Sequence, residues 1–341
     1  MMRKLIIAAA ALLLGAVAFA QKQYSYTVDR IWSQGYASFP SIEKFNGAWY
    51  ITFREGESHV FDKNGIAAGK IRILRSEDGV EWKSIALLEK EGFDLRDPKL
   101  SVTPDGKLMV MIGGSVYVEK KNVARVPHVS FSKDGKTFSN PQEALIDGKT
   151  SEDDWLWRVT WAGKTAYTVS YRKDHKTGYE HLMSSNDGVK WKSVSEIPVC
   201  GNETTLRMLP DGRMAALVRR EGKGNTSCWC TSKAPYTEWE VKEMKSKVNG
   251  PDMIVLRDGR IIAGGRSLDS DAPKTKLWEV TPEGKLTELL VLPSGGDNSY
   301  PGFAQVGNEL WVVYYSSHEL RRDNGRPRAA IYLAKIPIDI L

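Results

Sequence analysis

One pattern recurs six times along this chain and constrains its fold more than any other feature. Each copy consists of two short apolar runs around a turn that contains Asn-Gly, Asp-Gly, Ala-Gly or Gly-Asn. Such pairs supply the positive φ that a tight hairpin turn requires, so each copy is predicted to be a β-hairpin. The copies follow one another at intervals of 46 to 60 residues, and they start at Phe39, Asp97, Trp157, Glu203, Pro251 and Tyr300.

The segments between these hairpins add further strands. Two strand-like runs, at residues 71–75 and 84–88, lie between the first and second copies, for example. Four strands per repeat at this period are typical of a β-propeller blade. The sequence therefore predicts an all-β fold, a six-bladed β-propeller, in which residues 24–32 and 329–336 complete and close the ring.

The first 20 residues are predicted to be a signal peptide. Arg3 and Lys4 are basic, residues 5–19 are almost wholly apolar, and residues 18–20 provide small residues for cleavage before Gln21. We therefore expect an exported protein, secreted or periplasmic, with a single propeller domain over residues 21–341. No later run approaches the length of a membrane span, so we expect no membrane insertion.

Charge and cysteine content narrow the class of protein. The formal net charge is +6, but the sequence has no long Lys/Arg run of the kind that binds nucleic acid. Three cysteines are too few for a disulfide framework. Cys200 could pair with Cys228 or Cys230, or all three could be free thiols. We expect no cofactor, no metal and a monomeric protein.

A second repeat lies in the predicted outer hairpins. Residues 76–82, 132–138 and 185–191 share the form Ser-x-Asp-Gly-x-x-aromatic, and residues 232–239 are a degenerate fourth copy. In such a turn the aspartate accepts backbone hydrogen bonds, the glycine takes a positive φ, and the aromatic ring covers the turn. These aspartates are therefore predicted to stabilise the fold and not to act in catalysis.

The outer turns resemble the Asp-box (BNR) repeats of the sialidase superfamily, and the whole mature chain is similar to a sialidase-like six-bladed propeller. The resemblance implies the fold more strongly than the activity, because Asp boxes also occur in lyases and in binding propellers.

The hairpin topology predicts which polar residues share one face. Strand starts and second-strand ends of every blade meet on the side opposite the hairpin turns. An arginine-rich rim of this kind suits a carboxylate or sulfate ligand, although single arginines could instead pair with neighbouring acids, such as Arg54 with Glu55 or Arg96 with Asp97. The predicted rim contains Arg54, His59, Arg96, Asp97, Arg158, Arg172, Glu203, Arg219, Asp252, Arg266, Tyr300 and His318.

The resemblance implies roles for several rim residues. In sialidases a tyrosine is the nucleophile and a glutamate activates it, which implies Tyr300 and Glu203 here. Arg219 and Arg266 match carboxylate-binding arginines, and Arg54 resembles an additional one. Two departures are visible: Ser38-Phe39-Pro40 replaces the Arg-Ile-Pro signature, and His59 stands where the family has its catalytic aspartate.

Either His59 or Asp97 is therefore predicted to be the proton donor. Arg96, Arg158, Arg172, Asp252 and His318 are predicted to be further substrate-binding residues. These residues favour a sialidase-like exo-glycoside hydrolase that removes an acidic, carboxylated sugar from a glycan. Two alternatives stay open: a uronate lyase that uses the His, Tyr and Arg residues for β-elimination, and a non-catalytic glycan-binding propeller.

Overall fold

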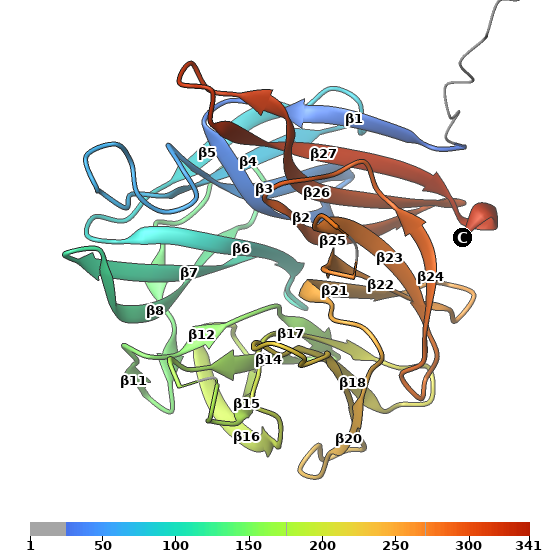
Figure 1. Ribbon diagram of the computed structural model, residues 1–341. Helices are drawn as coiled ribbons and strands as arrows, with labels where there is room; N and C mark the ends of the chain where they lie inside the picture. Colours follow the sequence, from blue (N-terminus) through green and yellow to red (C-terminus); the bar gives the residue numbers. More distant parts are fainter. Residues whose placement is uncertain (1–24, 175, 270) are drawn as a thin grey trace, which may run out of the picture.

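The computed structural model describes residues 25–174, 176–269 and 271–341, so the predicted signal peptide lies outside the described residues. The described chain is almost entirely β-structure, and six sheets follow one another in chain order around a central axis (Figure 1). The first strands of neighbouring four-stranded sheets contact one another at this axis. The predicted β-propeller is therefore present.

Five of the six sheets are regular four-stranded blades with consecutive antiparallel strands. The first contains β2 (Tyr36–Phe45), β3 (Ala48–Gly56), β4 (Lys70–Ser76) and β5 (Lys83–Leu88), and the second contains β6 (Asp94–Val102), β7 (Leu108–Val118), β8 (Lys121–Ser132) and β9 (Gln142–Glu143). The fourth contains β17 (Asn202–Met208), β18 (Met214–Arg219), β19 (Cys228–Ser232) and β20 (Glu240–Glu243), and the fifth contains β21 (Asn249–Val255), β22 (Ile261–Ser267), β23 (Lys274–Val280) and β24 (Leu286–Val291).

The sixth blade closes the ring with strands from both ends of the described chain. Its order is β25 (Asn298–Val306), β26 (Glu309–Arg321), β27 (Pro327–Pro337) and, on the outer edge, β1 (Thr27–Trp32). The pairing of β1 with β27 confirms the predicted closure. A short 3-10 helix (Ile338–Ile340) follows, and no helix of the described residues is long and apolar enough to cross a membrane.

The sequence predicted six blades, but the structure has five regular ones, and the third sheet is a larger, curled sheet of seven short strands. The expected first strand breaks into β12 (Trp155–Leu156) and β13 (Thr160–Ala162), since residues 157–159 between them leave the strand and carry Arg158 into the centre. The remaining strands are β10 (Leu145–Ile146), β11 (Lys149–Thr150), β14 (Thr165–Tyr171), β15 (Glu180–Ser185) and β16 (Lys190–Ile197). At the outer edge β10 pairs in parallel with β16.

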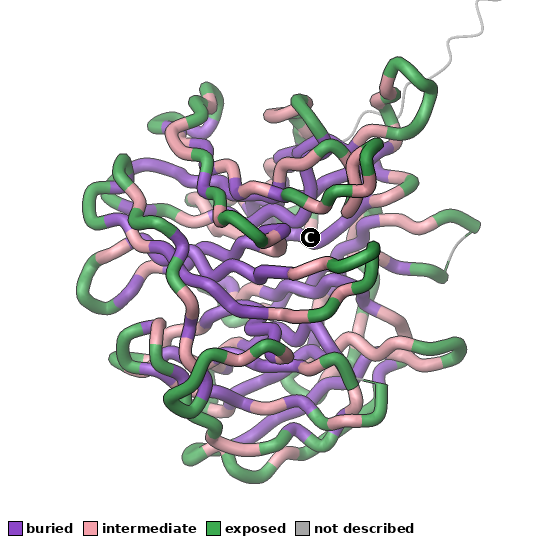
Figure 2. The backbone as a smooth tube through the Cα atoms, turned by 90° about the vertical axis from the view of Figure 1, so that its left-hand side faces the viewer, coloured by how far each residue is buried: buried purple, intermediate pink, exposed green. Residues whose placement is uncertain are grey.

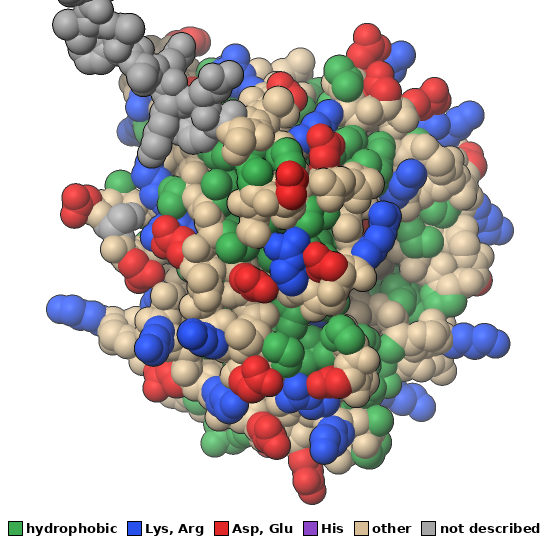
Figure 3. Space-filling view, turned by 90° about the vertical axis from the view of Figure 1, so that its right-hand side faces the viewer, with side chains coloured by type: hydrophobic (Ala, Val, Ile, Leu, Met, Phe, Trp, Pro, Cys, Tyr) green, Lys and Arg blue, Asp and Glu red, His purple; other side chains and the backbone are tan. Residues whose placement is uncertain are grey.

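Apolar side chains fill the space between neighbouring sheets. Buried residues run along the strands, and exposed ones gather at the turns (Figure 2). On the face shown in Figure 3, basic and acidic side chains lie interspersed. All three cysteines are free thiols, so the open question of a disulfide is answered for the described chain.

The outer turns have the predicted hydrogen bonds and also join neighbouring sheets. Asp78 Oδ1 accepts the backbone N–H groups of Val80 and Glu81, at 2.8 and 2.9 Å, and Asp134 and Asp187 do the same in their turns. These bonds lower the pKa of Asp78 to about 2. The turn glycines lie against large side chains of the preceding sheet, as Gly135 does against Tyr50.

A repeated β-bulge positions the residues at the axis. In all five regular blades the pairing of the first strand with the second shifts at the same place. A residue in the left-handed region lies at each shift, namely Phe39, Asp97, Glu203, Gly250 and Tyr300, with φ between 46° and 60°. Bulges re-aim side chains, so this irregularity brings residues from different blades together.

Candidate active site

Tyr300, Glu203 and Arg219 form the centre of the site. The Tyr300 hydroxyl, on β25, donates a 2.7 Å hydrogen bond to Glu203 Oε1, on β17. Arg219, at the end of β18, donates to the Tyr300 oxygen at 3.2 Å and forms an ion pair with the second carboxylate oxygen of Glu203. The structure thus brings the two ends of the fourth hairpin together, as the topology predicted, and places Tyr300 of the sixth blade next to both.

Burial and charge keep the Tyr300 phenol neutral. The residue is 7% exposed, and burial together with the Glu203 carboxylate raises its pKa well above the ordinary value, although Arg219 and Arg266 act in the opposite direction. The phenolic proton therefore stays on Tyr300 and points at a carboxylate that can accept it. Such a pair can act as a neutral oxygen nucleophile with its base in place.

Aromatic side chains and one glycine hold the Tyr300 ring. The ring centroids of Phe39, Trp157 and Tyr315 lie 4.9, 5.8 and 5.9 Å from that of Tyr300. A Cβ atom on Gly250 would lie 2.7 to 2.8 Å from three Tyr300 ring atoms, so this bulge position requires glycine. The segment Ser38-Phe39-Pro40, one of the two departures from the sialidase pattern, thus places the Phe39 ring against Tyr300.

His59 is bound to Asp297, a residue that the sequence did not single out. His59 Nδ1 lies 2.6 Å from Asp297 Oδ2, and the imidazole is 46% exposed. Asp297 also accepts hydrogen bonds from Tyr36 (2.5 Å), Tyr315 (2.7 Å) and Arg266 (3.4 Å). Burial alone would raise the pKa of Asp297, but its hydrogen bonds and the His59 interaction hold it at about 2.

Asp97, the other candidate acid, lies in a buried charge cluster. Burial raises the pKa of Asp97, and Lys99, Arg96, Glu203 and His59 are the charges that act on it. Arg96 lies over the Phe39 ring, with 5.3 Å from Cζ to the centroid. Lys99 is 2% exposed, and burial lowers its pKa to about 7. Asp97 is therefore held close to Glu203 and in its protonated form over a wider pH range than a free carboxyl group.

Arg54 and Arg96 pair with Asp94 rather than with the acids next to them in sequence. Arg54 contacts Asp94 Oδ1 at 2.7 Å, its other donors reach the carbonyl oxygens of Ser58 and Val60, and its side chain is 1% exposed. Arg96 lies 3.3 Å from Asp94 Oδ2. The buried Arg54 anchors the loop that carries His59, whereas Arg96 keeps some exposed surface.

Arg158 and Asp252 form a buried ion pair. Arg158 contacts Asp252 Oδ2 at 3.1 Å and the Pro301 carbonyl oxygen at 2.5 Å, and Arg207 contacts Asp252 Oδ1 at 2.9 Å. Burial lowers the pKa of Arg158 to about 10. This network ties the third, fourth, fifth and sixth sheets together next to Tyr300, through the carbonyl oxygen of Pro301.

Two predicted residues lie apart from the centre. Arg172 is partly exposed and forms an ion pair with Asp154 at 3.2 Å. His318 bonds to Ser316 at 2.8 Å and lines a separate hollow with Arg30 and Tyr332. Arg266, in contrast, lies near Tyr300, where its interactions with Tyr315, Tyr300 and Asp297 outweigh burial and raise its pKa.

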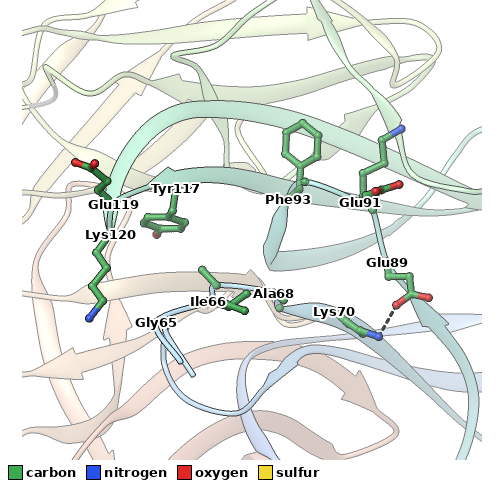
Figure 4. Close-up of a pocket in the computed structure, with 14 residues that line it drawn as sticks. Gly65, Ile66, Ala68, Lys70, Glu89, Glu91, Phe93, Tyr117, Glu119 and Lys120 are labelled. Atoms are coloured by element: carbon green, nitrogen blue, oxygen red, sulfur yellow. Dashed lines mark ion pairs between the residues drawn. The ribbon is translucent and has the colours of Figure 1, made fainter. Parts of the chain in front are cut away.

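A further hollow on the blade 1 and blade 2 side has a volume of about 720 Å³ (Figure 4). Tyr117 and Phe93 lie on one side of it and Ile66 and Ala68 on the other, and the Lys70–Glu89 ion pair lies at one end. The described residues that line it include none of the candidate catalytic side chains.

Comparison with known proteins shows similarity of fold. The sequence matches no protein-family model and no curated protein sequence. Similar solved structures include a protein of unknown function from Dyadobacter fermentans, with a TM-score of 0.71 and 19% identity over 91% of this chain and 99% of that one. The sialidase of Trypanosoma rangeli has a TM-score of 0.67 and 13% identity over 88% of this chain but 55% of that longer one.

The structure of an alpha-L-arabinanase of Penicillium chrysogenum, complexed with arabinobiose, is also similar to this one. Its TM-score is 0.64, with 16% identity over 92% of this chain and 98% of that one. At these identities the similarity shows the β-propeller fold that these glycoside hydrolases have.

Proposed function

We propose that this protein is a glycoside hydrolase that removes a carboxylated sugar from the end of a glycan. The observation that carries the proposal is the 2.7 Å hydrogen bond from the buried Tyr300 hydroxyl to Glu203, with Arg219 on both groups. The fold shared with a sialidase and an arabinanase supports action on a glycan. The carboxylate specificity rests on the cations Arg219, Arg266 and Arg96 around Tyr300.

In the first step the Tyr300 oxygen attacks the anomeric carbon while Glu203 accepts the phenolic proton. The bond to the leaving group breaks with its electron pair, and an acid protonates the departing oxygen. The product is a glycosyl-tyrosine intermediate and a shortened glycan. Water then attacks the same carbon and gives one proton to the residue that had protonated the leaving group. The bond between this carbon and the Tyr300 oxygen breaks, Glu203 returns its proton to that oxygen, and the sugar is released with retained configuration.

A tyrosine suits a substrate with a carboxylate at the reacting carbon. An Asp or Glu nucleophile would be repelled by that carboxylate, whereas the neutral phenol that burial maintains is not. Arg219 would interact with both the nucleophile and the substrate carboxylate. Arg266, whose two contacts are long at 3.4 and 3.5 Å, can turn toward a ligand more easily than the buried Arg54.

His59 is the proton donor in this proposal, with Asp97 as the second candidate. The half-exposed imidazole lies against Phe39, at 5.2 Å between ring centroids, and Phe39 in turn contacts Tyr300. Because Asp297 binds Nδ1, Nε2 is the nitrogen that can reach a leaving group.

The same His59–Asp297 pair also favours a second reaction, β-elimination from a uronate. There His59 would remove the proton next to the carboxylate that the arginines bind, and Tyr300 would protonate the leaving oxygen. Hydrolysis yields a saturated sugar, whereas elimination yields an unsaturated product that absorbs ultraviolet light. Product analysis therefore separates the two reactions.

The test is turnover by Tyr300→Phe, after a screen of sialyl, uronyl and sulfated glycans has identified a substrate. Removal of the nucleophilic oxygen is expected to lower kcat by about a thousandfold or more. Tyr314→Phe is the matched control, because it removes a buried hydroxyl of the same blade that bonds the Pro293 carbonyl oxygen at 2.9 Å. Undiminished turnover by Tyr300→Phe would exclude the nucleophile role, and binding without any product would favour the glycan-binding alternative.

A further inference from the structure

A groove begins at His59 and Asp297, and its other lining residues have no role in the mechanism above. Its volume is about 470 Å³. Its lining includes side chains from residues 57–63, after β3, and from residues 322–327, in the hairpin between β26 and β27. This hairpin extends past the neighbouring strands (Figure 1).

The groove is continuous with the proposed active site. His59 and Asp297 both line it. Asp297 in turn accepts hydrogen bonds from Arg266 and Tyr315, whose groups lie next to Tyr300. A glycan whose terminal sugar lies at Tyr300 can therefore extend past His59, the proposed proton donor, into this groove.

The carboxylates of the groove are largely engaged, whereas its cations are not. Asp297 is bonded to the four side chains named above. Asp62 accepts hydrogen bonds from the backbone N–H groups of Asn64 and Ile66, both at 2.8 Å. Glu57 is the third acid and is exposed. Within the described part of the chain, no carboxylate lies within ion-pair distance of the cationic groups of Lys63, Arg322 and Arg326.

Arg322 is the most firmly held of these cations. Its guanidinium lies over the Tyr36 ring, 5.5 Å from the centroid, and the Tyr36 hydroxyl is bonded to Asp297 at 2.5 Å. The Arg322 Nε atom is buried without a hydrogen-bond partner. A planar guanidinium fixed on an aromatic ring is well placed to bind a carboxylate or sulfate with two hydrogen bonds.

We propose that this groove is a second subsite, which binds the carboxylate or sulfate of the sugar next to the one that is cleaved, with Arg322 as its main ligand. The inference rests on the proposed function and extends it to the substrate class: the preferred substrate is an oligosaccharide with acidic groups on its two terminal units.

The experiment compares the wild-type protein with Arg322→Gln on substrates whose second unit is neutral, carboxylated or sulfated. The ratio of kcat/KM for the acidic to the neutral second unit is expected to fall about tenfold in the variant, equivalent to about 1.4 kcal/mol. Lys120→Gln, which removes a cation from the hollow of Figure 4, should leave this ratio unchanged. A fall of this ratio for the carboxylated substrates, for the sulfated ones or for both shows whether the subsite binds carboxylate, sulfate or both.

An unchanged ratio in Arg322→Gln would overturn the proposal. Arg326→Gln, in the exposed hairpin, provides a second variant if loss of the Tyr36 contact impairs folding. If the wild-type protein cleaves none of the glycans, the proposed function fails, and calorimetric binding of the same oligosaccharides tests the groove separately. In that case Arg322→Gln should weaken binding of the acidic series about tenfold, and equal binding by both proteins would overturn the inference.

Discussion

At the scale of single residues, Asp297 links the two halves of the site. It binds His59 through one carboxylate oxygen and Arg266 through the other, so the proposed proton donor and an arginine proposed to bind the substrate carboxylate share one anchor. Charge-assisted hydrogen bonds of this kind are stronger than neutral ones. Asp297 therefore contributes to stability as well as to the geometry of the site.

The pKa of Asp297 leads to a pH-dependent prediction. Because this pKa is about 2 in the folded protein and 3.8 ordinarily, the charged carboxylate stabilises the fold fully above pH 4, and the contribution is lost as the pH falls toward 2. Asp297→Asn is expected to lower the free energy of unfolding by about 2 kcal/mol at pH 7, with a smaller difference from the wild-type protein at pH 3. Urea unfolding at both values measures this, and a difference that grows at pH 3 would contradict it.

Part of the site could be predicted from residue types, and part could not. Tyr300, Glu203, Arg219 and His59 stand out because their chemistry and their positions in the hairpins agree. The sequence did not single out Asp297, because this residue lies three positions before the sixth hairpin start and is not part of the repeated hairpin. The sequence does contain a pattern that includes Asp297. Asp94 and Asp154 also stand three residues before a hairpin start, the second and the third, and both bind rim arginines.

At the scale of elements, the hairpins follow from their turns, but the bulges do not. Apolar alternation and Asx-Gly turns predict where strands pair, whereas a bulge depends on contacts across the axis. Phe39 illustrates this: its φ of 60° is unfavourable for a bulky residue, and contacts with Tyr300 and Tyr315 support it. The sequence therefore could not show that Phe39, and not Ser38, faces Tyr300.

The outer turns lead to a prediction about contacts between neighbouring sheets. A Cβ atom on Gly135 would lie 2.0 Å from the Tyr50 hydroxyl of the preceding blade, and φ is 70°. Gly135→Ala is expected to destabilise the protein by roughly 3 kcal/mol, about 1 from the backbone and the rest from displacement of Tyr50. Gly106→Ala, with φ of 75° and no atom within 4 Å, is the matched control and should cost only about 1 kcal/mol.

Urea unfolding of both glycine variants separates the two effects. The difference between them reports the packing of the outer turn against the preceding blade. Equal costs for Gly135→Ala and Gly106→Ala would mean that this contact adds nothing to stability.

At the scale of the whole molecule, the ring and its closure were predictable, whereas the third sheet was not. The repeat period and the two terminal strands indicate a closed propeller. At the break, residues 157–159, Arg158 pairs with Asp252, which lies far away in the sequence, and no local sequence pattern predicts such a contact. The predicted count of six blades was wrong, because five sheets are regular blades and the third is a curled sheet.

The closure itself can be weakened at Trp32, the last residue of β1. Its indole N–H donates to Glu55 Oε2 at 3.1 Å, Arg72 lies over its ring at 5.2 Å, and its ring contacts Phe53 at 5.7 Å. Trp32 therefore fastens the outer strand of the sixth blade to the first blade. Trp32→Ala is expected to lower stability by roughly 2 to 3 kcal/mol, below the usual cost of a core tryptophan because the side chain is partly exposed.

The loss should be local, because a closed ring opens first where its two ends meet. Hydrogen exchange in Trp32→Ala should therefore accelerate in residues 27–32 and 327–337 before it accelerates elsewhere. Trp239→Ala is the matched control, since that partly buried tryptophan packs between the third and fourth sheets, away from the closure. If both variants accelerated exchange evenly over all blades, the ring would unfold as a single unit and the β1–β27 pair would not be its weakest point.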